Sequence, residues 1–435
     1  MTRSRFAGLA LRLGAIAVLT GRVTTANADP PMIRLWPGDP PCETTLQACV
    51  DGAGPRDGIR IATNGPIWET ITFSKPLALT AQPGFEPIFL GDGIFASTSD
   101  SGDQSIRIQG LVIGGGRIQV RQQSSGAATI DVENNAVDSI ALYPAIEVDA
   151  DPYNPTGPLS FVVSGNMIEV PLGPQGSGIV VVAGSSSASG SIARNEITMT
   201  GGNDGSAIEV DDLANDLSVD VIGNRIAGTD YDSGIELYGS GAGTLTARVL
   251  DNLVTGQNGT AGAPGAISAH ASQAPLQLTI VNNTLAGNDA GILVGLNDAS
   301  STAVIANNAL TQNVKGLVLD VAPGANISER NDLFFGNTSD ILGAVAGPNS
   351  IFANPRYASG SDFHLQPGSP AIDAGDDGSV PVDLTTDLER SPRIQGAHVD
   401  IGAYEAPEPS AELSNAAAGF ALAVGGVAST RRLLG

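Results

Sequence analysis

An asparagine followed two residues later by an aliphatic residue recurs along most of the chain, and no other feature constrains the fold as strongly. Successive copies are 23 to 31 residues apart. The copies are Asn135, Asn166, Asn195, Asn224, Asn252, Asn283, Asn308 and Asn331. A motif that returns so often at this spacing predicts a stack of similar units rather than a single globular core.

A second landmark, a small residue followed by alternating aliphatic residues, lies 9 to 15 residues after each of the first seven asparagines. Its first aliphatic residues are Ile146, Ile179, Ile208, Ile235, Ile267, Ile292 and Leu317. Each repeat thus offers two short strand-like segments with a period of two, which cannot bury a core alone. Stacked coils can bury one. The aliphatic residues would then point inward, with backbone hydrogen bonds between coils about 4.8 Å apart.

We expect the repeat asparagines to stack at one corner of these coils, because asparagine tolerates a left-handed backbone and its amide can form a ladder. In this pattern, residues 65–345 resemble the right-handed parallel β-helix proteins. That all-β architecture is shared by pectate lyases, polygalacturonases and many surface proteins. The resemblance implies a fold and leaves the activity open.

The composition agrees with a solenoid and narrows the possible partners. Glycine contributes 55 residues and aromatic residues only 4%, whereas the 42% hydrophobic content is too high for a disordered chain. The formal net charge of −24 disfavours nucleic acid and anionic membranes, because both require a basic surface. Cations, neutral glycans and other surface material remain open as partners.

The N-terminus has the features of an export signal. Residues 1–28 contain basic residues, a short apolar run and the small-residue pattern Ala26-Asn27-Ala28, and they are predicted to be a removed signal peptide. The alternative is a membrane anchor, for which the apolar run is shorter than the roughly 20 residues that a span needs.

Residues 29–64 are predicted to close the N-terminal end of the coils with a short helix near Thr45–Val50. The only two cysteines, Cys42 and Cys49, would form a disulfide in an oxidising compartment. Seven helical residues would hold them roughly 10 Å apart, too far for a bond. The disulfide therefore requires Cys42 to precede the helix.

Residues 346–406 carry the motifs Gly368-Ser369-Pro370-Ala371-Ile372-Asp373-Ala374-Gly375 and Val399-Asp400-Ile401-Gly402-Ala403-Tyr404-Glu405. These motifs resemble the choice-of-anchor Q region of secreted β-helix proteins, which implies a surface-attachment context and no catalysis. From its residues, we interpret the segment as a C-terminal cap. Its aspartates Asp373, Asp387 and Asp400 would pair with Arg390 and Arg393, or alternatively bind calcium.

Residues 407–435 contain Pro407-Glu408-Pro409, an apolar stretch and Arg431-Arg432. This order is similar to the PEP-CTERM sorting tails of Gram-negative bacteria, which implies processing by a membrane-bound sorting protease and delivery to the cell surface or extracellular matrix. A glycolipid-anchor signal is the rival interpretation, although the basic ending disfavours it.

Counting outward positions from the inward isoleucines places six polar side chains from three consecutive coils in two columns. They are Glu209, Glu236 and Ser268 in one column and Asp211, Tyr238 and His270 in the next. Neighbours are about 4.8 Å apart in a column and about 6.6 Å apart along a strand. The sequence therefore predicts a compact outward patch of carboxylates, phenol and imidazole.

Three roles are open for this patch. Glu209, Asp211 and Glu236 offer the hard oxygen ligands that Ca²⁺ prefers. A polysaccharide lyase or glycoside hydrolase is the catalytic alternative, and a solvated acidic face is the structural one. The candidate catalytic residues are Glu236, Asp211, Tyr238 and His270, and the candidate sugar-binding residues are Tyr231, Tyr238 and Arg248.

Other charged residues are assigned structural roles. Arg225 is expected to pair with Glu196 on the neighbouring coil, and Arg248 has no partner that the sequence identifies. Glu147 and Asp149 are interpreted as a solvated edge. Only three histidines occur, widely separated in the sequence, so the chain gives zinc no support.

The sequence thus favours an exported, monomeric β-helix of a Gram-negative cell surface that binds extracellular polysaccharide or serves as an adhesive scaffold. A carbohydrate-active enzyme that uses the outward patch is the alternative. The sequence shows no Gly-His-Gly motif of the polygalacturonase type and no nucleophile elbow.

Overall fold

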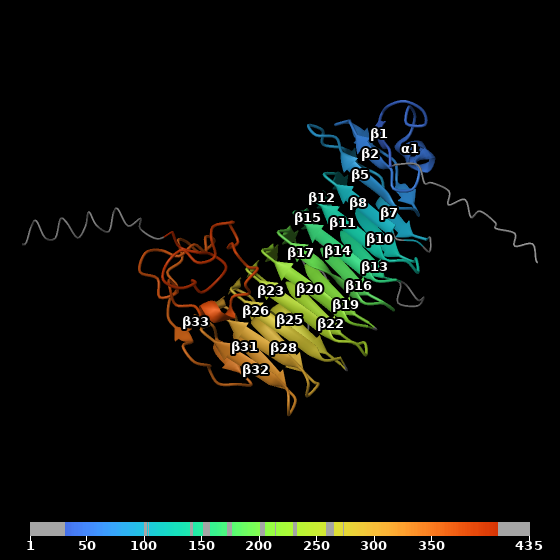
Figure 1. The fold of residues 1–435 in the computed structure, drawn as a ribbon. Helices are drawn as coiled ribbons and strands as arrows, with labels where there is room; N and C mark the ends of the chain where they lie inside the picture. The colour runs from blue at the N-terminus through green and yellow to red at the C-terminus, as the bar shows by residue number, and fades with distance from the viewer. Residues whose placement is uncertain are drawn as a thin grey trace, which may run out of the picture.

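Three parallel sheets wind around one axis and form a β-helix (Figure 1). The computed structural model describes residues 31–407 except 100, 101, 103, 140, 141, 151–156, 172–175, 201–204, 214, 229–232, 258–264 and 273. The predicted signal peptide and nearly all of the predicted sorting tail lie outside these residues. Within the described part, no helix is both long and apolar enough to cross a bilayer. The all-β solenoid that the repeat predicts is confirmed.

Each complete coil contributes three strands, one to each sheet, whereas the sequence analysis recognised two. The overlooked strands form sheet A, in which 12 strands pair in parallel. Sheet A comprises β1 (Ile33–Trp36), β2 (Gly58–Ile61), β5 (Leu77–Ala81), β8 (Gln104–Gln109), β11 (Ala128–Glu133), β14 (Leu159–Ser164), β17 (Ala188–Ala193), β20 (Leu217–Ile222), β23 (Leu245–Leu250), β26 (Leu276–Val281), β29 (Thr302–Ala306) and β32 (Asn326–Arg330).

Sheet B contains the short strands that follow the repeat asparagines, also 12 in number. It comprises β3 (Pro66–Ile67), β6 (Ile88–Phe89), β9 (Val112–Gly114), β12 (Ala136–Asp138), β15 (Met167–Val170), β18 (Glu196–Met199), β21 (Arg225–Gly228), β24 (Leu253–Thr255), β27 (Thr284–Ala286), β30 (Ala309–Thr311), β33 (Leu333–Phe335) and β35 (Ile351–Phe352).

Sheet C contains the strands of the second landmark and has 11 strands. It comprises β4 (Ile71–Phe73), β7 (Gly93–Thr98), β10 (Arg117–Gln122), β13 (Ile146–Ala150), β16 (Ile179–Ala183), β19 (Ile208–Asp212), β22 (Ile235–Gly239), β25 (Gly265–Ala271), β28 (Ala290–Leu296), β31 (Lys315–Val321) and β34 (Ser339–Leu342).

Columns of aliphatic side chains fill the interior of the β-helix. In sheet C, Ile146 pairs with Ile179, Ile179 with Ile208, and Ile208 with Ile235 in direct register. None of these four side chains is accessible to solvent. Complete burial of one such side chain contributes about 1.5–3 kcal/mol. The columns therefore fix the register, because a one-residue slip would move each isoleucine to the outer face.

The predicted ladder is confirmed for seven of the eight repeat asparagines. In each rung the backbone N–H and the Nδ2 of one asparagine donate to the Oδ1 of the next, as Asn195 does to Asn224 at 2.9 and 3.0 Å. The ladder runs through Asn135, Asn166, Asn195, Asn224, Asn252, Asn283, Asn308 and Asp332. Asp332, not Asn331, occupies the last rung.

The sequence analysis placed the left-handed backbone conformation on the repeat asparagines, and this prediction was wrong by one residue. The left-handed conformation belongs to the residue before each ladder asparagine, for example Arg194 (φ 56°), Gly223 (φ 65°) and Asp251 (φ 54°). The ladder asparagines themselves are buried. Their burial explains why the same hydrogen bonds repeat in each rung, since a buried amide needs partners for its donor and acceptor groups.

A second, shorter ladder lies at the corner between sheets B and C and was not predicted. Asn288 donates its backbone N–H and Nδ2 to Oδ1 of Asn313, and Asn313 donates in the same way to Asn337. Gln257 extends this ladder by donating its backbone N–H to Asn288. These later coils are therefore hydrogen-bonded at two corners.

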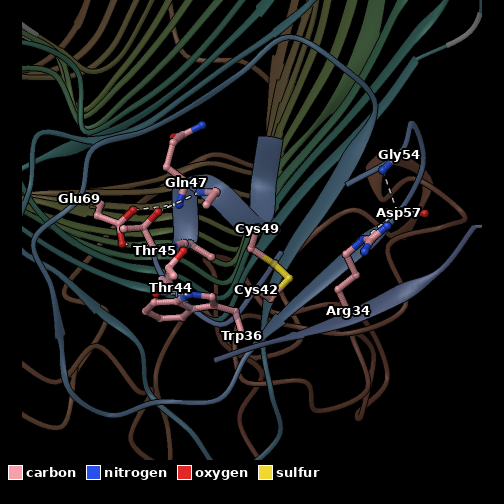
Figure 2. Close-up of a disulfide and its surroundings, with 12 residues drawn as sticks. Arg34, Trp36, Cys42, Thr44, Thr45, Gln47, Cys49, Gly54, Asp57 and Glu69 are labelled. Atoms are coloured by element: carbon pink, nitrogen blue, oxygen red, sulfur yellow. Dashed lines mark hydrogen bonds and ion pairs between the residues drawn. A yellow bond between two sulfur atoms is a disulfide. The ribbon is translucent and has the colours of Figure 1, made fainter. Parts of the chain in front are cut away.

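The N-terminal end is covered as predicted, by α1 (Leu46–Gly52). Thr45 caps this helix by accepting the N–H of Ala48, and the Glu69 carboxylate accepts the N–H groups of Leu46 and Gln47 (Figure 2). Coil stacking nevertheless begins before residue 65, because β1 already pairs with β2. The region 29–64 is thus part of the β-helix as well as its cap.

The structure joins Cys42 and Cys49 in a disulfide, with their Cα atoms 4.2 Å apart (Figure 2). The helix begins only at Leu46, so Cys42 lies in the turn before it, as the geometric argument required. Both cysteines are buried beneath the first coil.

The C-terminal segment, residues 354–406, contacts the side of several coils, a placement that the interpretation as a C-terminal cap did not include. It packs against the side of the later coils, where Figure 1 shows it in red. Leu384 packs against Leu250, Val281 and Ala306, which come from three successive coils. A second apolar contact joins the segment to Ala309 and Leu333. Apart from the short 3₁₀ helix η1 (Asp377–Ser379) and two isolated antiparallel β-bridges, this segment consists of turns and irregular backbone.

Candidate functional site

The predicted patch on the outward face of sheet C assembles in the expected register. β19 pairs with β22 so that Glu209 lies beside Glu236 and Asp211 beside Tyr238. β22 pairs with β25 so that Glu236 lies beside Ser268 and Tyr238 beside His270. The inward isoleucines fix this arrangement, because side chains alternate between the two faces of a strand.

Serines hold the two glutamates of the patch. Ser177 Oγ donates to Glu209 Oε2 at 3.2 Å, and Ser206 Oγ donates to Glu236 Oε2 at 2.7 Å. Each serine lies just before the sheet C strand of the preceding coil. The same contact thus repeats in two consecutive coils and limits the rotation of both carboxylates.

The acidity of Asp211 is perturbed. Burial, followed by the negative charge of Glu236, raises the pKa of Asp211 to about 6, against a hydrogen bond with Glu209 that lowers it. Asp211 therefore carries a proton in mildly acidic solution and loses it near neutrality. A carboxyl group with this property is suited to proton transfer.

An aromatic pair completes the patch. The rings of Tyr238 and His270 meet edge to face, with centroids 5.3 Å apart. Nε2 of His270 lies 3.9 Å from Oε1 of Glu236. The patch therefore combines an apolar ring surface with three acidic groups and one imidazole.

Among the described side chains, no group of three or more His, Cys, Asp or Glu residues is arranged to hold a metal ion. The carboxylates Glu209, Asp211 and Glu236 have the chemistry that calcium prefers, but Ser177 and Ser206 occupy one oxygen of each glutamate. Calcium binding at this patch stays a prediction.

The structure separates Arg248 from the patch. Arg248 lies on β23 in sheet A, where its Nε and Nη2 donate to Asp220 at 2.6 and 2.5 Å. Its Nη1 and Nη2 also donate to Asp383 at 2.9 and 2.8 Å. The guanidinium thus connects sheet A to the C-terminal segment, a partner that the sequence analysis did not identify. Tyr231, another of the three predicted sugar-binding residues, lies outside the described residues.

Arg225 also differs from its predicted role. It approaches Glu389 at 3.6 Å and donates to Oη of Tyr404 at 3.1 Å, rather than pairing with Glu196. Both partners belong to the C-terminal segment. The prediction of Glu196 as the partner was wrong, because the C-terminal segment folds back and places other partners beside Arg225.

Sequence reasoning missed a second polar cluster, which lies on the same face of sheet C toward the N-terminus. Arg117 and Arg121 contact Glu147 at 3.3 and 3.5 Å, and Arg121 also contacts Asp149 at 3.3 Å. The Arg117 guanidinium lies 4.2 Å from the ring centroid of Tyr143. Glu147 and Asp149 therefore belong to an ion-pair network and are not a simple solvated edge.

The two clusters share columns, a signal that was present in the sequence. Arg121 pairs with Asp149, Asp149 with Val182, and Val182 with Asp211. Val180 and Val182 separate the clusters with an apolar step. The four inter-strand steps from β10 to β22 span about 19 Å. Sheet C thus presents one continuous strip with ionic, apolar and acidic-aromatic sections.

The fold is that of a parallel β-helix protein, and the strip is a continuous row of side chains on the outward face of its sheet C. Among solved structures, the chain is similar to the crystal structure of pectate lyase Pel9A, with a TM-score of 0.50 and 13% sequence identity. The match covers 87% of this chain and 97% of the lyase chain. The sequence matches no family model and no curated protein. The similarity shows the fold, and the C-terminal resemblances remain predictions.

Proposed function

We propose that this protein is an exported, cell-surface β-helix that binds an extended polysaccharide along the outward face of sheet C. The observation that carries the proposal is the in-register alignment of the ionic cluster and the acidic-aromatic patch in shared columns. Repeated coils present such groups at about 4.8 Å intervals, which suits a linear polymer better than a compact ligand. Aromatic rings and charged hydrogen-bonding groups are the usual contacts for sugar rings and their substituents.

Binding is expected to depend on Tyr238 and on Arg121. Tyr238→Ala removes the half-buried aromatic ring of the patch, and Arg121→Ala removes a cation of the ionic cluster, so each is expected to weaken binding about tenfold. Affinity electrophoresis and calorimetry with a panel of neutral, uronate-containing and amino-sugar polymers measure this effect. Parallel titrations with Ca²⁺ and with a chelator test the predicted metal requirement.

Glu169→Gln provides a control, because Glu169 is an exposed carboxylate on β15 in sheet B. It should leave binding unchanged, whereas Glu236→Gln on sheet C should alter it. If variants on both sheets bind equally well, or if no polymer in the panel binds, the proposed face is not a polysaccharide site.

A catalytic role is the second candidate, and the raised pKa of Asp211 specifically favours it. A lyase or hydrolase that needs protonated Asp211 as its acid would lose activity as the pH rises through about 6. Asp211→Asn should then abolish the release of unsaturated products or reducing ends while polymer binding persists. Binding without turnover at any pH from 4 to 9 would restrict the protein to the scaffold role.

A further inference from the structure

The contact between the C-terminal segment and the side of the β-helix contains a buried ionic cluster. Arg393 has a relative exposure of 2%. Its Nη1 donates to Oδ1 of Asp251 at 2.6 Å, and its Nη2 donates to Oε1 of Glu405 at 2.5 Å. Asp251 belongs to the corner between β23 and β24, whereas Arg393 and Glu405 belong to the segment. One guanidinium therefore connects the two parts through two buried carboxylates.

The charges in this cluster do not balance when every group is ionised. Asp387 adds a third carboxyl group near Asp251, and Asp400 lies near Glu405. Backbone N–H groups occupy the oxygens of Asp387 and Asp400, including those of Ser391 and Ala406. Arg393 is the cation that these carboxyl groups share.

One oxygen of Asp251 is bound by Arg393, and the other differs from it. Its Oδ2 is buried without a hydrogen-bond partner among the described residues. A cavity of about 150 Å³ adjoins it, lined by Arg194, Asp383 and Asp387 among others. Asp383 is engaged by Arg248. A second carboxylate without a neutralising charge costs free energy in such a buried site. The docked arrangement of the segment therefore requires a bound proton.

We propose that the C-terminal segment is a pH-dependent strap, docked on the coils while the Asp251–Arg393–Glu405 cluster retains one proton and released as that proton is lost. Release would expose the apolar side of the later coils that Leu384 covers. The strap is a property of the fold and does not depend on the proposed polysaccharide function.

The pKa values of the cluster are shifted in the direction that release of the strap at higher pH requires. Burial raises the pKa of Asp251 to about 7 and that of Glu405 to about 7, although Arg393 opposes the rise in both cases. A carboxyl group with a raised folded-state pKa contributes its full stabilisation below its unfolded pKa. That contribution is lost as the pH rises through the folded pKa, here near 7.

A second titrating group lies within the strap itself. Nδ1 of His364 lies 2.5 Å from Asp362, and Nε2 lies 3.0 Å from Glu389, the residue that Arg225 of β21 approaches. Burial lowers the pKa of His364, but the hydrogen bonds from Asp362 and Glu389 outweigh it and raise the pKa overall. This bridge joins residues of the strap only, so the imidazolium stabilises the fold of the strap, and that contribution is lost as the imidazolium deprotonates.

Hydrogen exchange of the full chain between pH 5.5 and 9, corrected for intrinsic rates, tests the strap. The reporters are the amides of Gly402 and Ala403, which donate to the carbonyl of Asn307 and to Oγ1 of Thr284 on the coils. Their protection is expected to fall about tenfold as the pH rises from 6 to 8.5. Protection of the Asn195 amide inside the ladder should stay constant over the same range.

Asp251→Asn is expected to flatten this pH dependence, because it removes one of the two buried carboxylates opposite Arg393. Asparagine also tolerates the left-handed backbone at this position. Asp383→Asn is the matched control: it weakens an exposed contact and should lower protection equally at every pH. Glu405→Gln is the second variant should Asp251→Asn fail to fold. Reporter protection that is independent of pH, or an unchanged slope in both variants, would overturn the proposal.

Discussion

Asn224→Ala is expected to lower the free energy of unfolding by about 4 kcal/mol, because it removes four buried hydrogen bonds. Oδ1 of Asn224 accepts the backbone N–H and the Nδ2 of Asn195, at 2.9 and 3.0 Å. Its Nδ2 donates to the carbonyl of Ile192 and to Oδ1 of Asn252, each at 2.9 Å. The site admits no solvent, so water cannot replace these contacts.

Urea unfolding, followed by circular dichroism, measures this loss. The matched control is Asn326→Ala, which makes the same substitution at an exposed position on β32 and should change stability by less than about 0.5 kcal/mol. A loss of under about 1 kcal/mol for Asn224→Ala would mean that the aliphatic columns alone hold the coils together.

The success of the sequence in predicting this ladder has a physical basis. Each coil must present the same residue at the same corner, so a stacked hydrogen bond appears in the sequence as a repeat. The inward isoleucines of sheet C repeat for the same reason. Their period of two places Glu209 and Glu236 side by side without knowledge of any loop.

Sheet A escaped prediction because its inward pattern is interrupted. Gly190 on β17 occupies an inward position, where an aliphatic residue would have revealed the strand. A Cβ atom at Gly190 would lie 2.6 Å from the ring of Phe161 on the neighbouring coil. The large ring of one coil thus fills the space left by the next, and a pattern based on single coils cannot show that exchange.

The contacts of the C-terminal segment were unpredictable for a different reason. Arg393 and Asp251 are 142 residues apart in the sequence, and Arg248 and Asp383 are 135 apart. Their pairing depends on how an irregular segment folds back across the coils, and no repeat encodes that path. Column arithmetic predicts neighbours within the β-helix and is silent about residues that approach from outside it.

Asp332→Asn is expected to stabilise the protein by about 1–3 kcal/mol at pH 8, because it completes the ladder with the amide that every earlier rung carries. Oδ1 of Asp332 accepts the N–H and the Nδ2 of Asn308, at 2.7 and 3.0 Å, as an asparagine would. Its Oδ2 is buried without a hydrogen-bond partner among the described residues. In earlier rungs the Nδ2 donates to a carbonyl of the preceding coil, as Asn308 does to Ile280.

This gain should grow with pH. Burial raises the pKa of Asp332 well above its ordinary value, and the nearby Glu329 carboxylate adds to the rise. The protonated acid resembles the amide, so its stabilisation is complete below the unfolded pKa and is lost as the pH rises. Urea unfolding at pH 5 and pH 8 should therefore show a larger benefit of Asp332→Asn at pH 8.

Asp320→Asn, at an exposed position on β31, changes the same charge without burial and should show no such difference. A benefit independent of pH would contradict a raised pKa for Asp332, because the benefit varies with pH only when the pKa differs between the folded and unfolded states. A loss of stability at pH 8 would mean that the last position of the ladder requires a carboxylate.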